Sequence, residues 1–105
     1  MATTIDYIEF VCEQLQGLKD ELRYKKMFGE YMIYLNDKPI FIVCNNTVFV
    51  KIIAATEELI SESSKGSPYK GAKEHYILDI EDRDLTQKVA LAVEAVTPVP
   101  KPRRR

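Results

Sequence analysis

The chain of 105 residues is poor in the residue types from which active sites and metal centres are built. His75 is its single histidine, and Cys12 and Cys44 are its only cysteines, far apart in the sequence. Zinc sites need several such ligands at short spacings, and a cysteine–histidine nucleophile pair needs an orienting group beside it. The sequence therefore predicts no catalytic residue, no metal and no cofactor. We expect both cysteines to be reduced core residues.

Long apolar runs and nucleotide-binding motifs are also missing. No stretch approaches the ~18 apolar residues of a membrane-spanning helix. The first residues lack the basic and apolar regions of a secretory signal, so we expect a cytoplasmic protein with no membrane association. The sequence contains neither a P-loop nor a G-x-G-x-x-G motif, which argues against the common nucleotide-binding enzymes.

An excess of positive charge is missing outside the C-terminal end. The chain has 15 basic and 16 acidic residues, and the basic ones include Lys101 and three arginines at positions 103–105. The remaining body is acidic, whereas nucleic-acid binders normally present a basic face. We therefore do not expect direct nucleic-acid binding. The length fits one domain over residues 1–97, followed by a flexible Pro/Arg-rich tail over residues 98–105.

Apolar residues recur at helical spacing in three segments. Each segment has a polar residue near its start that could cap the helix. The expected helices are one after Thr3 or Thr4 that stops at Gly17, one over residues 54–63 with Thr56 as a possible cap, and one after Glu81 or Asp82 that stops at Thr97-Pro98.

Between the helices, β-rich runs predict strands over residues 24–28, 31–35, 39–44, 47–52 and 74–80, with a loop over residues 63–68. Asn36-Asp37 and Asn45-Asn46 separate three of these runs and suit two-residue type I′ hairpin turns. The order helix, four-stranded meander, helix, strand, helix indicates an α+β fold. We expect a two-layer domain with a mostly antiparallel sheet and flanking helices.

The two short turns predict a register in which Ile33 pairs with Ile40, Tyr31 with Ile42, and Ile42 with Phe49. Alternation then divides the meander into two apolar faces. We assign one face to the helices, and the other stays uncovered. The expected helix-covered face holds Met32, Tyr34, Phe41, Val43, Val48, Val50 and Ile52, whereas the expected uncovered face holds Tyr31, Ile33, Leu35, Ile40, Ile42, Cys44 and Phe49, with Lys38, Thr47 and Lys51 among them.

An uncovered face of this kind would expose more apolar surface than soluble monomers usually tolerate. We therefore predict a homodimer or a protein partner on the face formed by Ile33, Leu35, Ile40, Ile42 and Phe49. Two alternatives stay open: a ligand occupies this face, or the terminal helices divide between the two faces of the sheet.

The segment Lys25-Lys26-Met27-Phe28-Gly29-Glu30-Tyr31 resembles the N-terminal domain of the TfoX/Sxy competence regulators. The resemblance extends from Ile5 to Val96. It implies a two-layer α-β-β-β-α-β-β-α order, similar to secretion-chaperone folds. Further positions match in order, namely Val43-Cys44-Asn45-Asn46, Lys51, Pro68-Tyr69 and Tyr76.

This resemblance implies a non-enzymatic regulatory or protein-interaction module. A chain of 105 residues has no room for the helical C-terminal domain of the full-length regulators, so competence control does not carry over directly. The matched positions Glu30, Tyr31, Lys51, Tyr69 and Tyr76 are candidate ligand- or partner-binding residues, as one polar rim around the apolar sheet. The alternative function is a small anionic-ligand-binding domain, in which Lys51 attracts the anion.

Overall fold

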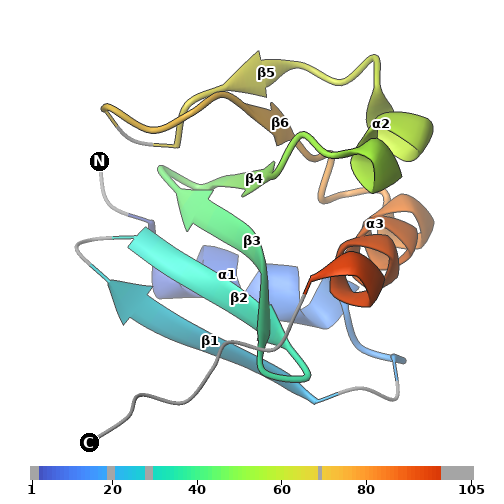
Figure 1. Ribbon diagram of the computed structural model, residues 1–105. Coiled ribbons are helices and arrows are strands. Elements are labelled where there is room, and N and C mark those ends of the chain that lie inside the picture. Colours follow the sequence, from blue (N-terminus) through green and yellow to red (C-terminus); the bar gives the residue numbers. More distant parts are fainter. Residues whose placement is uncertain (1–2, 19–20, 28–29, 69, 98–105) are drawn as a thin grey trace, which may run out of the picture.

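A computed structural model describes residues 3–18, 21–27, 30–68 and 70–97. Within these residues the chain forms three helices and one antiparallel sheet of six strands in the order β1-β2-β3-β4-β6-β5 (Figure 1). The predicted α+β class is confirmed. The elements are α1 (Ile5–Gln14), β1 (Leu22–Met27), β2 (Glu30–Leu35), β3 (Lys38–Cys44), β4 (Thr47–Val50), α2 (Ala54–Ile60), β5 (Lys65–Gly66), β6 (His75–Ile77) and α3 (Arg83–Val96).

Both predicted two-residue hairpin turns are present. Asn36 and Asp37 have φ angles of 54° and 65°, and Asn45 and Asn46 have φ angles of 53° and 55°. Asparagine and aspartate tolerate this left-handed geometry, which type I′ turns require at both central positions. The turns join β2 to β3 and β3 to β4, so local sequence builds the centre of the sheet.

The helix caps agree with the sequence in two cases out of three. The Thr4 hydroxyl accepts a hydrogen bond from Tyr7 N at 3.2 Å, and the Asp82 carboxylate accepts one from Leu85 N at 3.1 Å. Thr56 is not the cap of α2: that residue is Ile53, and the Thr56 hydroxyl accepts from Ile53 N at 3.0 Å. The same hydroxyl donates to Lys51 O at 2.7 Å, which satisfies this buried group.

The strand β5 corrects the prediction of a loop over residues 63–68. It pairs Lys65 with Tyr76 and Gly66 with His75, at the outer edge of the sheet. A strand of two residues is too short to show alternation, and its serine- and glycine-rich surroundings are typical of a loop. The resemblance implied two strands between the last two helices, and the structure has them. The structure also has β1, which the β-rich run over residues 24–28 predicted and the resemblance did not imply.

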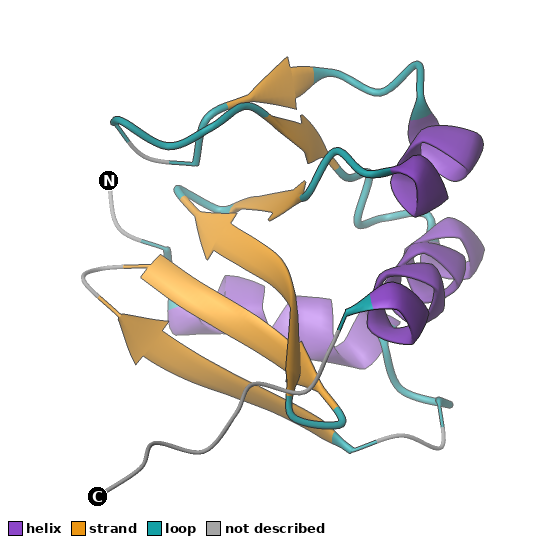
Figure 2. Cartoon of the chain, in the orientation of Figure 1, coloured by secondary structure: helices purple, strands orange, loops and turns teal. Residues whose placement is uncertain are grey.

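One face of the sheet is buried against the helices. Ile8 and Val11 of α1, its C-cap Leu15, and Val89 and Val93 of α3 belong to a single core cluster with the sheet. Figure 2 shows α1 behind strands β1 to β3. The helices therefore do not divide between two faces. The sheet side chains in this cluster are Tyr31, Ile33, Leu35, Ile40, Phe41, Val43, Val48, Val50 and Tyr76.

The predicted register between β2 and β3 is correct next to the turn, where Leu35 pairs with Lys38, but it is wrong beyond Ile40, which forms a bulge. Tyr34 pairs with Pro39, but Ile33 pairs with Phe41, so Ile40 has no partner of its own in β2. One extra residue shifts the pairing by one, and successive strand residues point to opposite faces. Tyr31, Ile33 and Leu35 therefore share the buried face with Phe41 and Val43, whereas Met32 and Tyr34 lie on the other.

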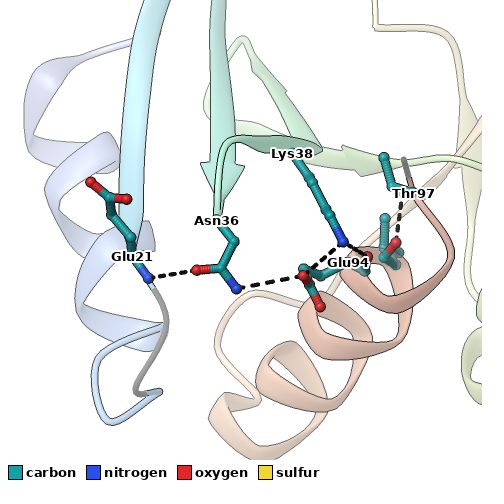
Figure 3. Close-up of polar contacts among 6 residues, drawn as sticks. Glu21, Asn36, Lys38, Glu94 and Thr97 are labelled. Atoms are coloured by element: carbon teal, nitrogen blue, oxygen red, sulfur yellow. Dashed lines mark hydrogen bonds and ion pairs between the residues drawn. The ribbon is translucent and has the colours of Figure 1, made fainter. Parts of the chain in front are cut away.

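A polar clamp joins the β2–β3 turn to the last turn of α3 (Figure 3). Lys38 Nζ lies 3.0 Å from Glu94 Oε2 and donates to Glu94 O at 3.2 Å. Asn36 donates to the same carboxylate at 3.5 Å and accepts from Glu21 N at 3.1 Å. The last turn of α3 contains no basic residue, so Lys38 supplies the cation that favours a helix C-terminus.

The bulge can be tested with a matched pair of alanine substitutions. Ile33→Ala should lower the free energy of unfolding by about 2–5 kcal/mol, because it leaves a cavity in the core. Ile42→Ala should cost about 1 kcal/mol, since this half-buried side chain lies on the other face. Urea denaturation followed by circular dichroism measures both, and equal costs would contradict the shifted register.

The clamp should make stability depend on pH in the acidic range. The hydrogen bond from Lys38 is the main cause that lowers the pKa of Glu94 below its ordinary value of 4.5. A carboxylate with a lowered pKa stabilises the fold above its unfolded pKa, and this contribution is lost as the pH falls through the folded value.

Between about pH 6 and about pH 3, the wild type should therefore lose more stability than Lys38→Met, measured by urea denaturation at each pH. Lys88→Met, an exposed substitution on α3, should keep the wild-type acid dependence. Parallel curves for wild type and Lys38→Met would refute the role of the clamp.

Candidate functional site

The face of the sheet opposite the core is called the open face here. Its central row consists of Met32, Ile42, Phe49 and Ile77, which are direct neighbours across β2, β3, β4 and β6. None of these side chains belongs to the core cluster. In the orientation of Figure 2, α1 lies behind β2 and β3 and leaves their other side without a helix among the described residues. The open face is thus apolar at its centre.

Opposite charges lie at two diagonal corners of the open face. Glu30 lies two residues before Met32 on β2, and Lys51 lies two residues after Phe49, directly after the end of β4. Because β2 and β4 both run antiparallel to β3, these positions are displaced in opposite directions from Ile42. Ile42 is therefore the midpoint between the acidic and the basic corner. Burial raises the pKa of Glu30.

Two further cations lie along β1. Arg23 and Lys25 pair with Tyr34 and Met32, so both belong to the open face. Arg23 is held by Asp37 at 2.7 Å and lies 5.4 Å from the centre of the Tyr34 ring. This ion pair is exposed and neutralises much of the Arg23 charge, so Arg23 contributes little net charge to the face.

The predicted polar rim does not form as one unit. Glu30 and Lys51 lie on the open face, but Tyr31 and Tyr76 lie on the buried one, with 8% and 2% of their surface exposed. The bulge causes the change for Tyr31, and pairing with Val50 places Tyr76 beside the core. Tyr69, like Phe28 and Gly29 of the matched segment, lies outside the described residues.

The predicted partner face is wrong for three of its five residues. Ile33, Leu35 and Ile40 are buried in the core cluster and cannot contact a partner. Ile42 and Phe49 do lie on the open face, where Phe49 is only 7% exposed, and the β3–β4 register that placed them is confirmed. The sequence does not place Met32, Tyr34 and Ile77 on this face, because the position of a bulge and the neighbours of β6 have no clear local signal.

The two cysteines lie in different environments. Cys12 packs against the core, as predicted, but Cys44 lies at the end of β3 on the open face, so its assignment to the core is wrong. Burial is the main cause that raises the pKa of the Cys44 thiol, and the charge of Glu30 adds to it. The strand register places Cys44 opposite Glu30 at the acidic corner, one position beyond the Tyr31–Val43 pair.

Two adjoining cavities lie at the basic corner and share Lys51 and His75. The first has a volume of about 100 Å³ and a mainly apolar lining, and the second, about 330 Å³, has a more polar one. His75 Nδ1 lies 2.8 Å from Lys73 O. A carbonyl oxygen only accepts, which assigns the proton to Nδ1 and leaves Nε2 free. The smaller cavity is lined by Met32, Pro39, Ile40, Phe41, Ile42, Phe49, Lys51 and His75, and the larger cavity by Lys51, Ile52, Ile53, Lys73, Glu74 and His75.

Among the described residues, no group of three or more histidine, cysteine, aspartate and glutamate side chains is placed to hold a metal ion. No helix in the described part of the chain is both long and apolar enough to cross a membrane. The arrangement on the open face instead offers apolar contact between two charged corners.

A relative of this chain is an uncharacterised 12.7 kDa protein from the trpE 5′ region of Spirochaeta aurantia. The two are 34% identical over 106 residues, which cover 99% of this chain and 91% of that protein. The chain belongs to the family of that bacterial protein. No protein-family model and no solved structure matches the chain, so the resemblance to TfoX/Sxy domains stays a prediction.

The acidic corner can be tested through the reactivity of Cys44. The thiolate is the reactive form, so a raised thiol pKa slows alkylation. Glu30→Gln should speed alkylation of Cys44 by iodoacetamide at about pH 8, by roughly two-fold. Mass spectrometry of the modified peptides measures the rate. Cys12 is the internal control, because its raised pKa follows from burial and Glu9. An unchanged Cys44 rate would argue against this proximity.

Proposed function

We propose that the protein is a non-enzymatic interaction module that pairs with a second copy through its open face. The observation that carries the proposal is the placement of Glu30 and Lys51 on opposite sides of Ile42, at equal distances along the register. A two-fold axis that lies in the interface at Ile42, perpendicular to the line from Glu30 to Lys51, would place Glu30 of each copy opposite Lys51 of the other. Such an isologous contact is the commonest form of homodimer.

The apolar row supports the same arrangement. Met32 and Phe49 flank Ile42 on either side, so the apolar rows of the two copies would cross at Ile42, with apolar side chains at the centre of the contact. Stable interfaces combine an apolar centre with a polar rim. The Glu30–Lys51 pairs would form part of this rim and set the orientation of the two copies. With the two-fold axis along the line from Glu30 to Lys51, like charges would meet instead.

The proposal includes a regulatory role in the cytoplasm, as the resemblance to the TfoX/Sxy N-terminal domains implies. A paired module of this size can present two identical outer surfaces to a further partner. The module needs no reacting group, in keeping with the apolar character of the row. A second candidate function, binding of a small anion, is favoured by the cavities beside Lys51 and His75.

Charge reversal at the two corners tests the pairing. Glu30→Lys should weaken the dimer by about ten-fold or more, because the introduced ammonium group of each copy would face Lys51 of the other, and Lys51→Glu should do the same. The double variant should restore pairing, since the attraction is rebuilt with the charges exchanged. Sedimentation equilibrium at low salt, where screening is weak, measures the dissociation constants.

Glu58→Lys is the matched control, because it makes the same charge change at an exposed position of α2. It should leave the dissociation constant unchanged. A wild-type chain that stays monomeric at about 100 μM, which excludes any dimer tighter than that, would refute the proposal. So would a double variant as weak as the two single variants, because the corners would then not face each other.

A further inference from the structure

The basic corner combines an apolar cavity with an adjoining polar one. The smaller cavity reaches between Met32, Ile42 and Phe49, whereas the larger one is bordered by Lys73 and Glu74. Lys51 and His75 line both and so stand at the boundary between them. Ligand sites characteristically combine an apolar lining with a few convergent polar groups. This corner has that composition.

The charges at the boundary favour an anion. Lys51 and Lys73 are exposed, and Glu74 is the one acidic residue that borders the cavities. The Lys73 carbonyl holds the His75 ring through Nδ1. Its Nε2 points away from this bond and is the ring nitrogen that can contact a ligand without a loss of the first hydrogen bond. Two ammonium groups and one imidazole can therefore meet a single negative group.

We propose that this corner binds a small aliphatic carboxylate, with its carboxylate at Lys51 and His75 and its apolar end against Ile42 and Phe49. The volume of the smaller cavity sets the size of the apolar end. About 100 Å³ corresponds to roughly three to four groups of the size of a water molecule, at ~30 Å³ each. A short branched chain of about four carbons has this size.

The β-bulge explains why the cavity lies at this place. Ile40 is turned into the core by the bulge and is 3% exposed. A bulge locally bends its strand and interrupts the regular row of side chains on the outer face. Ile40 and Pro39 accordingly form part of the cavity wall where a regular strand would present an alternating side chain. The binding site thus follows from the same feature as the buried face.

The experiment uses the full-length Glu30→Lys variant, in which pairing is expected to be lost but no cavity residue is changed. Sodium 4-methylvalerate and 4-methylpentan-1-ol are titrated separately, because they share one apolar body and differ in charge. Amide chemical shifts in two-dimensional NMR spectra report binding. The carboxylate should shift the signals of Ile42, Phe49 and His75, and the alcohol should bind about ten-fold more weakly or not at all.

Lys51→Met in the same background should weaken carboxylate binding by about ten-fold, whereas Lys88→Met on α3 should not change it. A titration with leucine, which carries an ammonium group beside its carboxylate, tests whether the ligand is an amino acid rather than a simple carboxylic acid. Tighter binding of leucine that is lost in Glu74→Gln would assign its ammonium group to Glu74.

Equal affinities for the alcohol and the carboxylate would overturn the proposal, as would equal effects of Lys51→Met and Lys88→Met. Absence of shifts at these residues with 4-methylvalerate and leucine up to about 50 mM would also overturn it, since no site of useful affinity would remain. The titration does not require pairing. A negative result here and a monomeric wild type are therefore separate outcomes.

Discussion

One additional residue in β3 determines what this protein presents to its surroundings. Ile40 has no partner of its own in β2, and the pairing of β2 with β3 is shifted beyond it. The shift turns Ile33 and Leu35 into the core and leaves Met32 and Tyr34 on the open face. Because side chains alternate along a strand, no smaller change could exchange the two faces of β2. The core, the open face and the cavity beside Ile42 all depend on this position.

The charges of the molecule follow its two layers. Helix α1 carries Asp6, Glu9 and Glu13 and no basic residue, whereas β1 carries Arg23, Lys25 and Lys26 and no acidic one. The acidic character of the body therefore resides largely on the helices. The sheet, by contrast, offers cations to a partner, and Glu30 is the acidic residue of the six strands. An anionic group would accordingly be drawn to the sheet side, where Lys51 and His75 lie beside an apolar cavity.

Lys51 links the two proposals. In the proposed pairing it would face Glu30 of a second copy, and in the proposed ligand site it would face the carboxylate of the ligand. One ammonium group cannot serve two carboxylates equally well at the same time, so a bound ligand and a second copy would compete for it. The Lys51 side chain belongs neither to the core nor to the Lys38–Glu94 clamp, which both lie on the other side of the sheet. The charge at position 51 is thus free to serve binding.

The α+β class, the meander and both type I′ turns could be predicted from the sequence, because asparagine-containing dipeptides and alternating β-rich runs act locally. The caps Thr4 and Asp82 are local for the same reason. The β3–β4 register followed from its turn, which placed Ile42 opposite Phe49. Only the tertiary structure decided that Ile40 is the extra residue, that β6 lies beside β4, and that Lys51 and His75 line the same cavity. These outcomes depend on how the helices and strands fill one core, and residues distant in sequence determine that packing together.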